Sequence, residues 1–190
     1  PFRSPHHTVS AAALTGGGTT PIPGEISLAH NGVLFLDELP EFSRLALETL
    51  RQPLEDGVVS IARVSGTLSY PCNTMFVAAM NPCPCGYFGH PTRKCTCSPQ
   101  AVQRYLGRIS GPLLDRMDIH VEVPPVAYDE LSSTQKAESS ADIKMRVNNA
   151  RKIQQKRFEK TKIASNSNMT TAMLKEFCKL DGQASEYLGK

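Results

Sequence analysis

Two acidic residues, Asp37 and Glu38, directly follow a continuous apolar run at residues 33–36. Such a run predicts a strand that is buried on both faces of a parallel sheet. A carboxylate at the carboxyl end of such a strand faces the crevice where open α/β sheets bind ligands. One carboxylate could hold Mg²⁺ through its water shell, and the other could polarise an attacking water. The pattern therefore favours phosphoryl-transfer chemistry, although an ordinary acidic turn before a helix has the same residues.

Four cysteines are clustered in one short stretch: Cys83, Cys85, Cys95 and Cys97. Four thiolates satisfy a tetrahedral Zn²⁺ ion and leave no open position for catalysis. The C-x-C spacing is tighter than that of common zinc knuckles, so free thiols or a redox pair are alternatives. His90 could replace one cysteine. We expect a structural Zn²⁺ site that stiffens this loop.

The strands that must position these residues alternate with helices, which indicates an α/β sandwich. Residues 75–80 form a second apolar run that ends in Asn81, and residues 119–123 are expected to form a third strand. Residues 1–24 are rich in Gly, Pro, Ser and Thr, and we expect residues 16–20 and 21–24 to be loop.

Helices are expected over residues 43–52, where Pro53 would end the helix, and over residues 99–109. Two strand-like runs lie between residues 58 and 70, and a two-residue turn signal separates them at 65–66. This arrangement predicts a β-hairpin between the two buried strands.

The composition changes after Pro125. Ser139 and Asp142 form a capping-box pattern before a long helix whose outer face is basic. We expect an α/β domain over residues 1–125 and the start of an all-helical domain over residues 126–190. The basic helix face could touch nucleic acid, but a solvated face is the simpler interpretation.

Three segments carry a family resemblance: residues 24–30 (GEISLAH), residues 32–38 (GVLFLDE) and residues 110–118 (SGPLLDRMD). They resemble the magnesium-chelatase-like family of AAA+ ATPases, in its ComM/YifB branch. The resemblance implies a partial AAA+ αβα sandwich with a β-hairpin insertion, followed by the start of an all-α lid domain.

The resemblance also implies residue roles. Asp37 and Glu38 would be the Walker B pair that serves Mg²⁺ and water, and Asn81 would be the sensor 1 residue that contacts the γ-phosphate or the water. Arg116 would be an arginine finger that reaches the nucleotide of a neighbouring subunit. A local ion pair with either flanking acid, Asp115 or Asp118, is the alternative for Arg116.

The predicted hairpin resembles one that projects into the central pore of related ring motors. Arg63 near its tip could then track a nucleic-acid backbone, and a solvated hairpin tip is the alternative. His6 and His7 invite a metal interpretation, but the ligand set is incomplete. The family resemblance implies a packing or interface role for this segment instead.

The implied whole protein is an ATP-driven ring motor, expected to be a hexamer, that acts on DNA as a helicase or branch-migration protein. Its cofactors would be ATP and Mg²⁺. One alternative is a chelatase-type motor that drives metal insertion, although the cysteine cluster favours the ComM branch. Another is a zinc-stabilised nucleic-acid-binding module without ATP chemistry.

The chain has 190 residues and a net charge of +3, too small to indicate nucleic-acid binding by itself. It begins with Pro1, contains no phosphate-binding G-x-x-x-x-G-K-[ST] motif, and has no apolar run that would span a membrane. We therefore expect a cytoplasmic protein segment that neither binds ATP tightly nor hydrolyses it alone.

Overall fold

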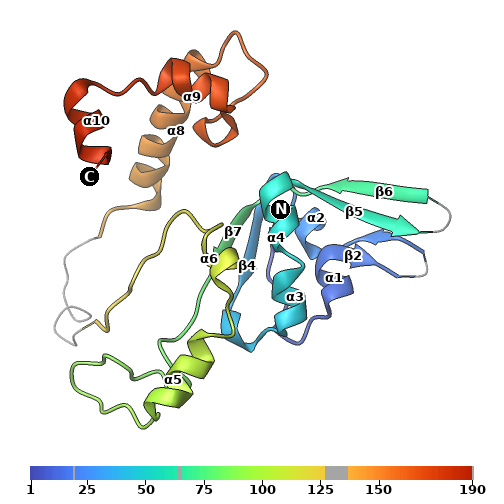
Figure 1. Cartoon of the computed structure of the whole chain (residues 1–190), viewed down its shortest axis with the longest axis vertical. Coiled ribbons are helices and arrows are strands. Elements are labelled where there is room, and N and C mark those ends of the chain that lie inside the picture. Colours follow the sequence, from blue (N-terminus) through green and yellow to red (C-terminus); the bar gives the residue numbers. More distant parts are fainter. Residues whose placement is uncertain (19, 64–65, 127–136, 190) are drawn as a thin grey trace. The chain divides into compact units, whose positions relative to one another are not determined.

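The computed structural model describes all residues except 19, 64–65, 127–136 and 190. The chain divides into two compact units, Pro1–Val126 and Ala127–Lys190, which are described separately here (Figure 1). Among the described residues, no helix is both long and apolar enough to cross a membrane.

A parallel sheet of three strands lies at the centre of the first unit. The strands are β1 (Phe2–Arg3), β4 (Val33–Leu36) and β7 (Met75–Ala78), in the spatial order β1-β4-β7. The central strand β4 pairs in parallel with both neighbours. The expected mixed α/β fold with a parallel sheet is therefore confirmed, and the two apolar runs form neighbouring strands.

The loop predicted over residues 16–20 and 21–24 is wrong in part, because two short strands lie within the segment of residues 1–24. Besides β1, this segment forms α1 (Ala11–Thr15), β2 (Gly16–Gly17) and β3 (Ile22–Pro23), and α2 (Glu25–Leu28) follows. Arg3 donates two hydrogen bonds, of 2.6 and 2.7 Å, to the carboxylate of Glu25, which connects β1 to α2. These elements are too short to show a hydrophobic period, and tertiary pairing stabilises them instead.

The core of this unit covers one face of β4. Leu34 and Leu36 are fully buried in a core cluster that also contains Leu14 of α1 and Leu47 of the helix α3 (Arg44–Glu48). Val33 and Phe35 on the other face are half-buried. Phe35 stacks on Phe2 at a ring-centroid distance of 6.3 Å. The expected burial on both faces is therefore complete on one face only.

The prediction of a single helix over residues 43–52 is wrong. The segment forms α3, and a second helix, α4 (Arg51–Asp56), begins at its end. The Ser43 hydroxyl caps α3 by accepting a hydrogen bond from the Ala46 amide at 3.2 Å. Pro53 lies in the first turn of α4 rather than after a helix. A first-turn amide has no partner within its helix, so a proline is tolerated there.

The predicted hairpin is confirmed. Strands β5 (Val58–Arg63) and β6 (Gly66–Pro71) pair antiparallel, with Arg63 opposite Gly66. The hairpin projects away from the parallel sheet (Figure 1). Residues 64–65, which include half of the predicted turn, lie outside the described residues.

The strand expected over residues 119–123 is absent: this segment has no regular structure. Ile119, Val121 and Val123 are 80%, 74% and 81% exposed. None of the described strands pairs with the segment. An alternating apolar pattern forms a strand only where a neighbour accepts its hydrogen bonds and covers its side chains, which explains the difference.

Two short helices complete the first unit. They are α5 (Pro99–Leu106), capped by the Ser98 hydroxyl, and α6 (Gly111–Leu114). Helix α5 ends earlier than the expected residue 109. Its buried residues, Val102 and Tyr105, lie on the face that packs into the unit.

The second unit is helical within its described residues. It contains α8 (Ser140–Arg157), a 3-10 turn (Asn166–Asn168), α9 (Thr171–Phe177) and α10 (Gly182–Leu188). The Ser139 hydroxyl accepts a hydrogen bond from the Asp142 amide, as the capping pattern predicted. Phe158 is 2% exposed and makes an edge contact with Phe177.

Candidate functional site

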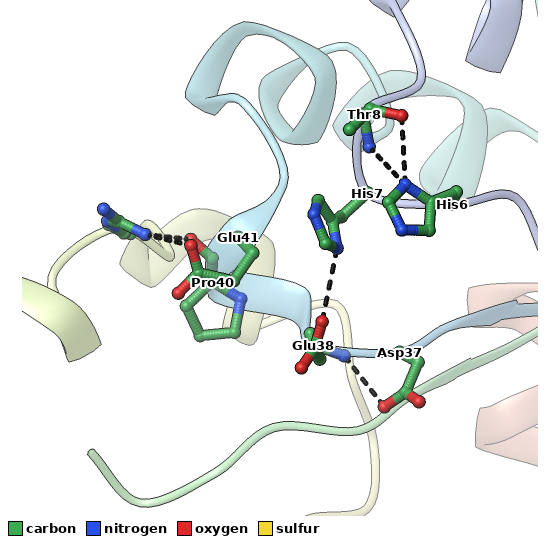
Figure 2. A network of polar contacts seen from close by, with 8 residues as sticks. His6, His7, Thr8, Asp37, Glu38, Pro40 and Glu41 are labelled. Carbon is green, nitrogen blue, oxygen red and sulfur yellow. Dashed lines mark hydrogen bonds and ion pairs between the residues drawn. The ribbon is translucent and has the colours of Figure 1, made fainter. Parts of the chain in front are cut away.

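The acidic pair lies in a tight turn at the carboxyl end of β4. Asp37 and Glu38 are both exposed, whereas the next two residues, Leu39 and Pro40, are buried and anchor the turn. Glu38 has left-handed backbone angles, φ 53° and ψ 47°, and its amide donates to Asp37 Oδ1 at 2.9 Å (Figure 2). A non-glycine residue in this conformation is strained, and such residues cluster at functional sites.

The end of β7 is held beside this turn. The Ala79 amide donates to the Leu36 carbonyl at 3.0 Å, and the Leu39 amide donates to the Ala79 carbonyl at 2.9 Å. Asn81 follows two residues later and is exposed. The two strand ends that carry Asp37, Glu38 and Asn81 therefore lie at the same edge of the sheet.

Tyr105 of α5 is only 6% exposed, and its hydroxyl interacts with the backbone of Asn81 at this edge. Burial raises the pKa of its hydroxyl, the Glu41 carboxylate raises it further, and a hydrogen bond with the Asn81 backbone lowers it. The charges of Glu38 and Cys83 also contribute to raising this pKa. Glu38, Asn81 and Cys83, the first cysteine of the cluster, therefore all act on the Tyr105 hydroxyl.

Arg108 supports the turn that follows the acidic pair. Its guanidinium donates to the Pro40 carbonyl and to Glu41 Oε2, both at 2.9 Å. Glu41 ends the short 3-10 helix η1 (Leu39–Glu41). The contact joins the segment after α5 to the segment after β4, so Arg108 is already paired within the chain.

His7 also reaches the acidic pair, which the sequence interpretation did not foresee. Its Nδ1 lies 3.3 Å from Glu38 Oε2, and Figure 2 shows the ring pointing toward this carboxylate. The contact could have been predicted if β1 had been recognised, because His7 follows β1 and the carboxyl ends of neighbouring parallel strands lie at the same edge of the sheet. A strand of two residues gave no pattern from which to infer that neighbour.

Arg116 pairs with neither of its flanking acids. Its guanidinium forms an ion pair with Glu55 of α4 and donates to the Pro112 carbonyl at 2.7 Å. Within the described part of the chain, no recorded contact joins Arg116 to Asp37 or Glu38. The alternative of a local ion pair with Asp115 or Asp118 is therefore not what the structure contains, and the proposed role of Arg116 as an arginine finger stays a prediction.

Arg63 ends β5, with its backbone opposite Gly66 at the far end of the hairpin. The position next to the tip agrees with the sequence interpretation. The structure does not describe its side chain, so its proposed contact with nucleic acid stays a prediction.

The four cysteines converge on one point. Their sulfur atoms all lie within 4.8 Å of one another, and Cys83 is fully buried. The Sγ–Sγ distances are 3.4 Å for Cys83–Cys85, 3.8 Å for Cys83–Cys95 and 3.6 Å for Cys85–Cys95. A tetrahedral ion with Zn–S bonds of about 2.3 Å needs sulfurs about 3.8 Å apart. The spacing thus fits one metal ion and is far longer than a disulfide bond of about 2 Å.

The surrounding loop supports a thiolate and stiffens the cluster. Hydrogen bonds from the backbone of Thr96 and Tyr87 lower the pKa of Cys85 to about 5. The guanidinium of Arg93 lies over the Tyr87 ring and donates to its hydroxyl at 2.8 Å. His90 Nδ1 accepts from the Thr92 and Arg93 amides, so its contacts are to the loop backbone and it is not part of the cluster.

Together, a parallel sheet, carboxylates at the end of its central strand and a hairpin between β4 and β7 agree with the partial AAA+ sandwich that the family resemblance implied. The family follows from the comparison of sequences. Residues 1–131 match the family model of magnesium chelatase, subunit ChlI, and residues 137–190 match that of its C-terminal region. The chain belongs to this magnesium-chelatase-like family.

Two relatives match the chain over nearly its whole length. YifB of Escherichia coli (strain K12) is 47% identical over 99% of this chain and 36% of YifB. The competence protein ComM of Haemophilus influenzae is 46% identical over 100% of this chain and 36% of ComM. The chain therefore spans little more than a third of the length of either relative.

A solved structure of NtrX from Brucella abortus in complex with ADP matches 63% of this chain and 24% of NtrX. The TM-score is 0.42 and the sequence identity is 18%.

Proposed function

We propose that this chain supplies part of the ATP-hydrolysing site of a ring-forming AAA+ motor that acts on DNA. One observation carries the proposal. Asp37 and Glu38 lie exposed at the carboxyl end of β4, beside the end of β7 that leads to Asn81. This edge is where open α/β sheets place ligands, and the chain belongs to an AAA+ family.

In this proposal Asp37 holds Mg²⁺ through its water shell, because Mg²⁺ gives up its waters reluctantly. Glu38 polarises the water that attacks the γ-phosphate, and Asn81 contacts that water or the phosphate. ATP and Mg²⁺ are thus the proposed cofactors. The exposure of both carboxylates supports these roles, since they are open to a ligand.

Arg116 is proposed to complete the site of a neighbouring subunit in a ring, which we expect to be hexameric. AAA+ proteins typically oligomerise, and a guanidinium can stabilise charge on the transferred phosphoryl group. In the single chain this guanidinium is paired with Glu55. Ring assembly would then exchange the Glu55 carboxylate for a nucleotide phosphate.

The test is the variant Glu38→Gln in the longest natural polypeptide that contains this sequence. We expect kcat for ATP hydrolysis to fall on the order of 100-fold with little change in ATP affinity, because only water activation is lost. Glu41→Gln is the matched control, since Glu41 lies three residues away and pairs with Arg108. Equal hydrolysis by the Glu38→Gln variant and the unmodified protein would overturn the proposal.

DNA is the proposed substrate, with helicase or branch-migration activity, because ComM, a competence protein, is similar to all of this chain. The position of Arg63 near the hairpin tip is compatible with a contact to a phosphate backbone. We expect single-stranded DNA to stimulate ATP hydrolysis, and Arg63→Ala to weaken this effect without changing hydrolysis in its absence.

The family name also admits a chelatase-type motor that drives metal insertion into a macrocycle. Stimulation of hydrolysis by a metal-free macrocycle and not by DNA would favour that function. Salt-dependent DNA binding with no ATP hydrolysis at all would favour the third alternative, a zinc-stabilised nucleic-acid-binding module.

We further propose that Zn²⁺ is the ion that fits the cysteine cluster. All four donors are cysteine sulfurs, and zinc readily takes four thiolates in tetrahedral geometry. The ion would supply no chemistry to the reaction and would fix the shape of the loop. Elemental analysis should find about one zinc per chain and almost none after Cys95→Ser with Cys97→Ser. The single variant Cys178→Ser is the control.

A further inference from the structure

We infer that His7 is a positioning residue for Glu38, and this inference rests on the proposed ATPase function. The imidazole Nδ1 lies 3.3 Å from Glu38 Oε2. The two residues are far apart in the sequence and meet because β1 and β4 are parallel neighbours. His7 would hold the carboxylate in the orientation from which it can accept a proton from water.

The His7 ring is held in place by its own neighbours. It packs on the His6 ring at a centroid distance of 4.0 Å and against the edge of Phe42 at 6.4 Å. Phe42 is only 3% exposed and belongs to the core. His7 therefore provides a donor whose position is set before any ligand arrives.

His6 does not compete for Glu38. Its Nδ1 contacts the Thr8 hydroxyl at 3.0 Å and accepts from the Thr8 amide, as Figure 2 shows. These contacts close a small turn that carries His7. The two histidines thus differ in function: His6 shapes the turn, and His7 reaches the carboxylate.

Glu38 needs such a partner because little else restrains its side chain. Its backbone conformation is set by the strained turn and by Asp37, but its side chain is 53% exposed. A free glutamate side chain samples many rotamers. The structure gives this contact as an ion-pair distance. In our proposal Nδ1 of His7 carries the proton and donates it, since an ionised carboxylate only accepts hydrogen bonds.

The decisive comparison uses two substitutions of His7. One preserves its hydrogen-bond donor and the other preserves its aromatic ring. His7→Asn keeps a donor close to the Nδ1 position and removes the ring. His7→Phe keeps a ring against Phe42 and removes the donor. If His7 positions Glu38, we expect His7→Phe to lower kcat about 10-fold without changing KM for ATP, and His7→Asn to recover most of the loss.

A packing role predicts the opposite order, in which the phenylalanine variant is active and the asparagine variant is impaired, and that order would overturn the inference. The assay uses the longest natural polypeptide that contains this sequence. His120→Phe is the control, because the exposed His120 contacts the Met117 carbonyl and not the acidic pair. If the unmodified polypeptide shows no hydrolysis that depends on Glu38, the proposed ATPase function is wrong. The contact between His7 and Glu38 is then tested by a measurement that does not require hydrolysis.

That measurement is made by NMR on the 190-residue chain. At a pH where the ring is neutral, long-range proton–nitrogen spectra report which ring nitrogen of His7 carries the proton. We expect Nδ1 in the unmodified chain and mainly Nε2 in Glu38→Ala. The same tautomer in both chains would show that His7 does not donate to Glu38.

Discussion

The cysteine cluster and the acidic edge of the sheet are close neighbours but are built in different ways. All four sulfur donors come from one loop, and they already lie within 4.8 Å of one another. The acidic edge instead draws on segments after β1, β4 and β7, with Arg108 reaching in from beyond α5. The first site is local in the sequence, whereas the second exists only because the sheet is assembled.

This contrast bears on how each site responds to change. A local site depends on its loop and on the ion it binds, because metal binding supplies the free energy that orders such loops. A site assembled from several strands depends on the core that aligns them. The two sites meet at Tyr105. Its hydroxyl interacts with the Asn81 backbone, and the charge of Cys83 contributes to raising the pKa of this hydroxyl.

The largest expected effect tests whether the cysteine cluster is truly local. A peptide of residues 81–98 alone should bind one Co²⁺ ion, used as a spectroscopic substitute for Zn²⁺, with the absorption of tetrahedral thiolate coordination. The same peptide with serine at positions 95 and 97 should not show this absorption. An intact peptide without the thiolate spectrum would show that the cluster needs the rest of the fold.

The second prediction separates the two sites through the core. Leu36→Ala removes a fully buried side chain next to Asp37 and should lower the free energy of unfolding by about 3 kcal/mol. Below the unfolding transition, the metal content should stay unchanged. Urea unfolding followed by circular dichroism measures the first effect. Leu45→Ala, at a position that is 70% exposed, is the control and should cost less than about 0.5 kcal/mol.

The smallest expected effect concerns the connection between α5 and the turn after β4. Arg108→Ala removes the contacts to Glu41 and the Pro40 carbonyl and should cost about 0.5 kcal/mol, because both charged side chains are substantially exposed to water. The same urea measurement applies. A loss above about 2 kcal/mol would mean that Arg108 supports the whole assembled edge.

The sequence predicted best the features that depend on near neighbours. The cysteine cluster, the hairpin and the Ser139 cap are all local, and the structure contains each of them. The position of Asp37 and Glu38 at the end of a strand also agreed with the prediction. A short apolar run that ends in charged residues predicts a buried strand of a parallel sheet and its carboxyl end.

The sequence was misleading where tertiary contacts decide. Strand β1 has only two residues, so no pattern revealed it, and the contact between His7 and Glu38 was missed for the same reason. Residues 119–123 had the right alternation for a strand but no described partner. The prediction that Pro53 ends a helix was wrong because α4 begins only two residues before it.

The exposed apolar residues at 119–123 also affect how the polypeptide behaves at high concentration. Ile119, Val121 and Val123 lie on alternate positions of a segment whose backbone is not paired in a sheet. Such segments recruit one another into intermolecular β structure. His120 and Glu122 stand between the apolar positions, where a charge opposes stacking of identical chains. Aggregation should therefore increase when the Glu122 carboxylate is neutralised, although this residue lies outside both sites.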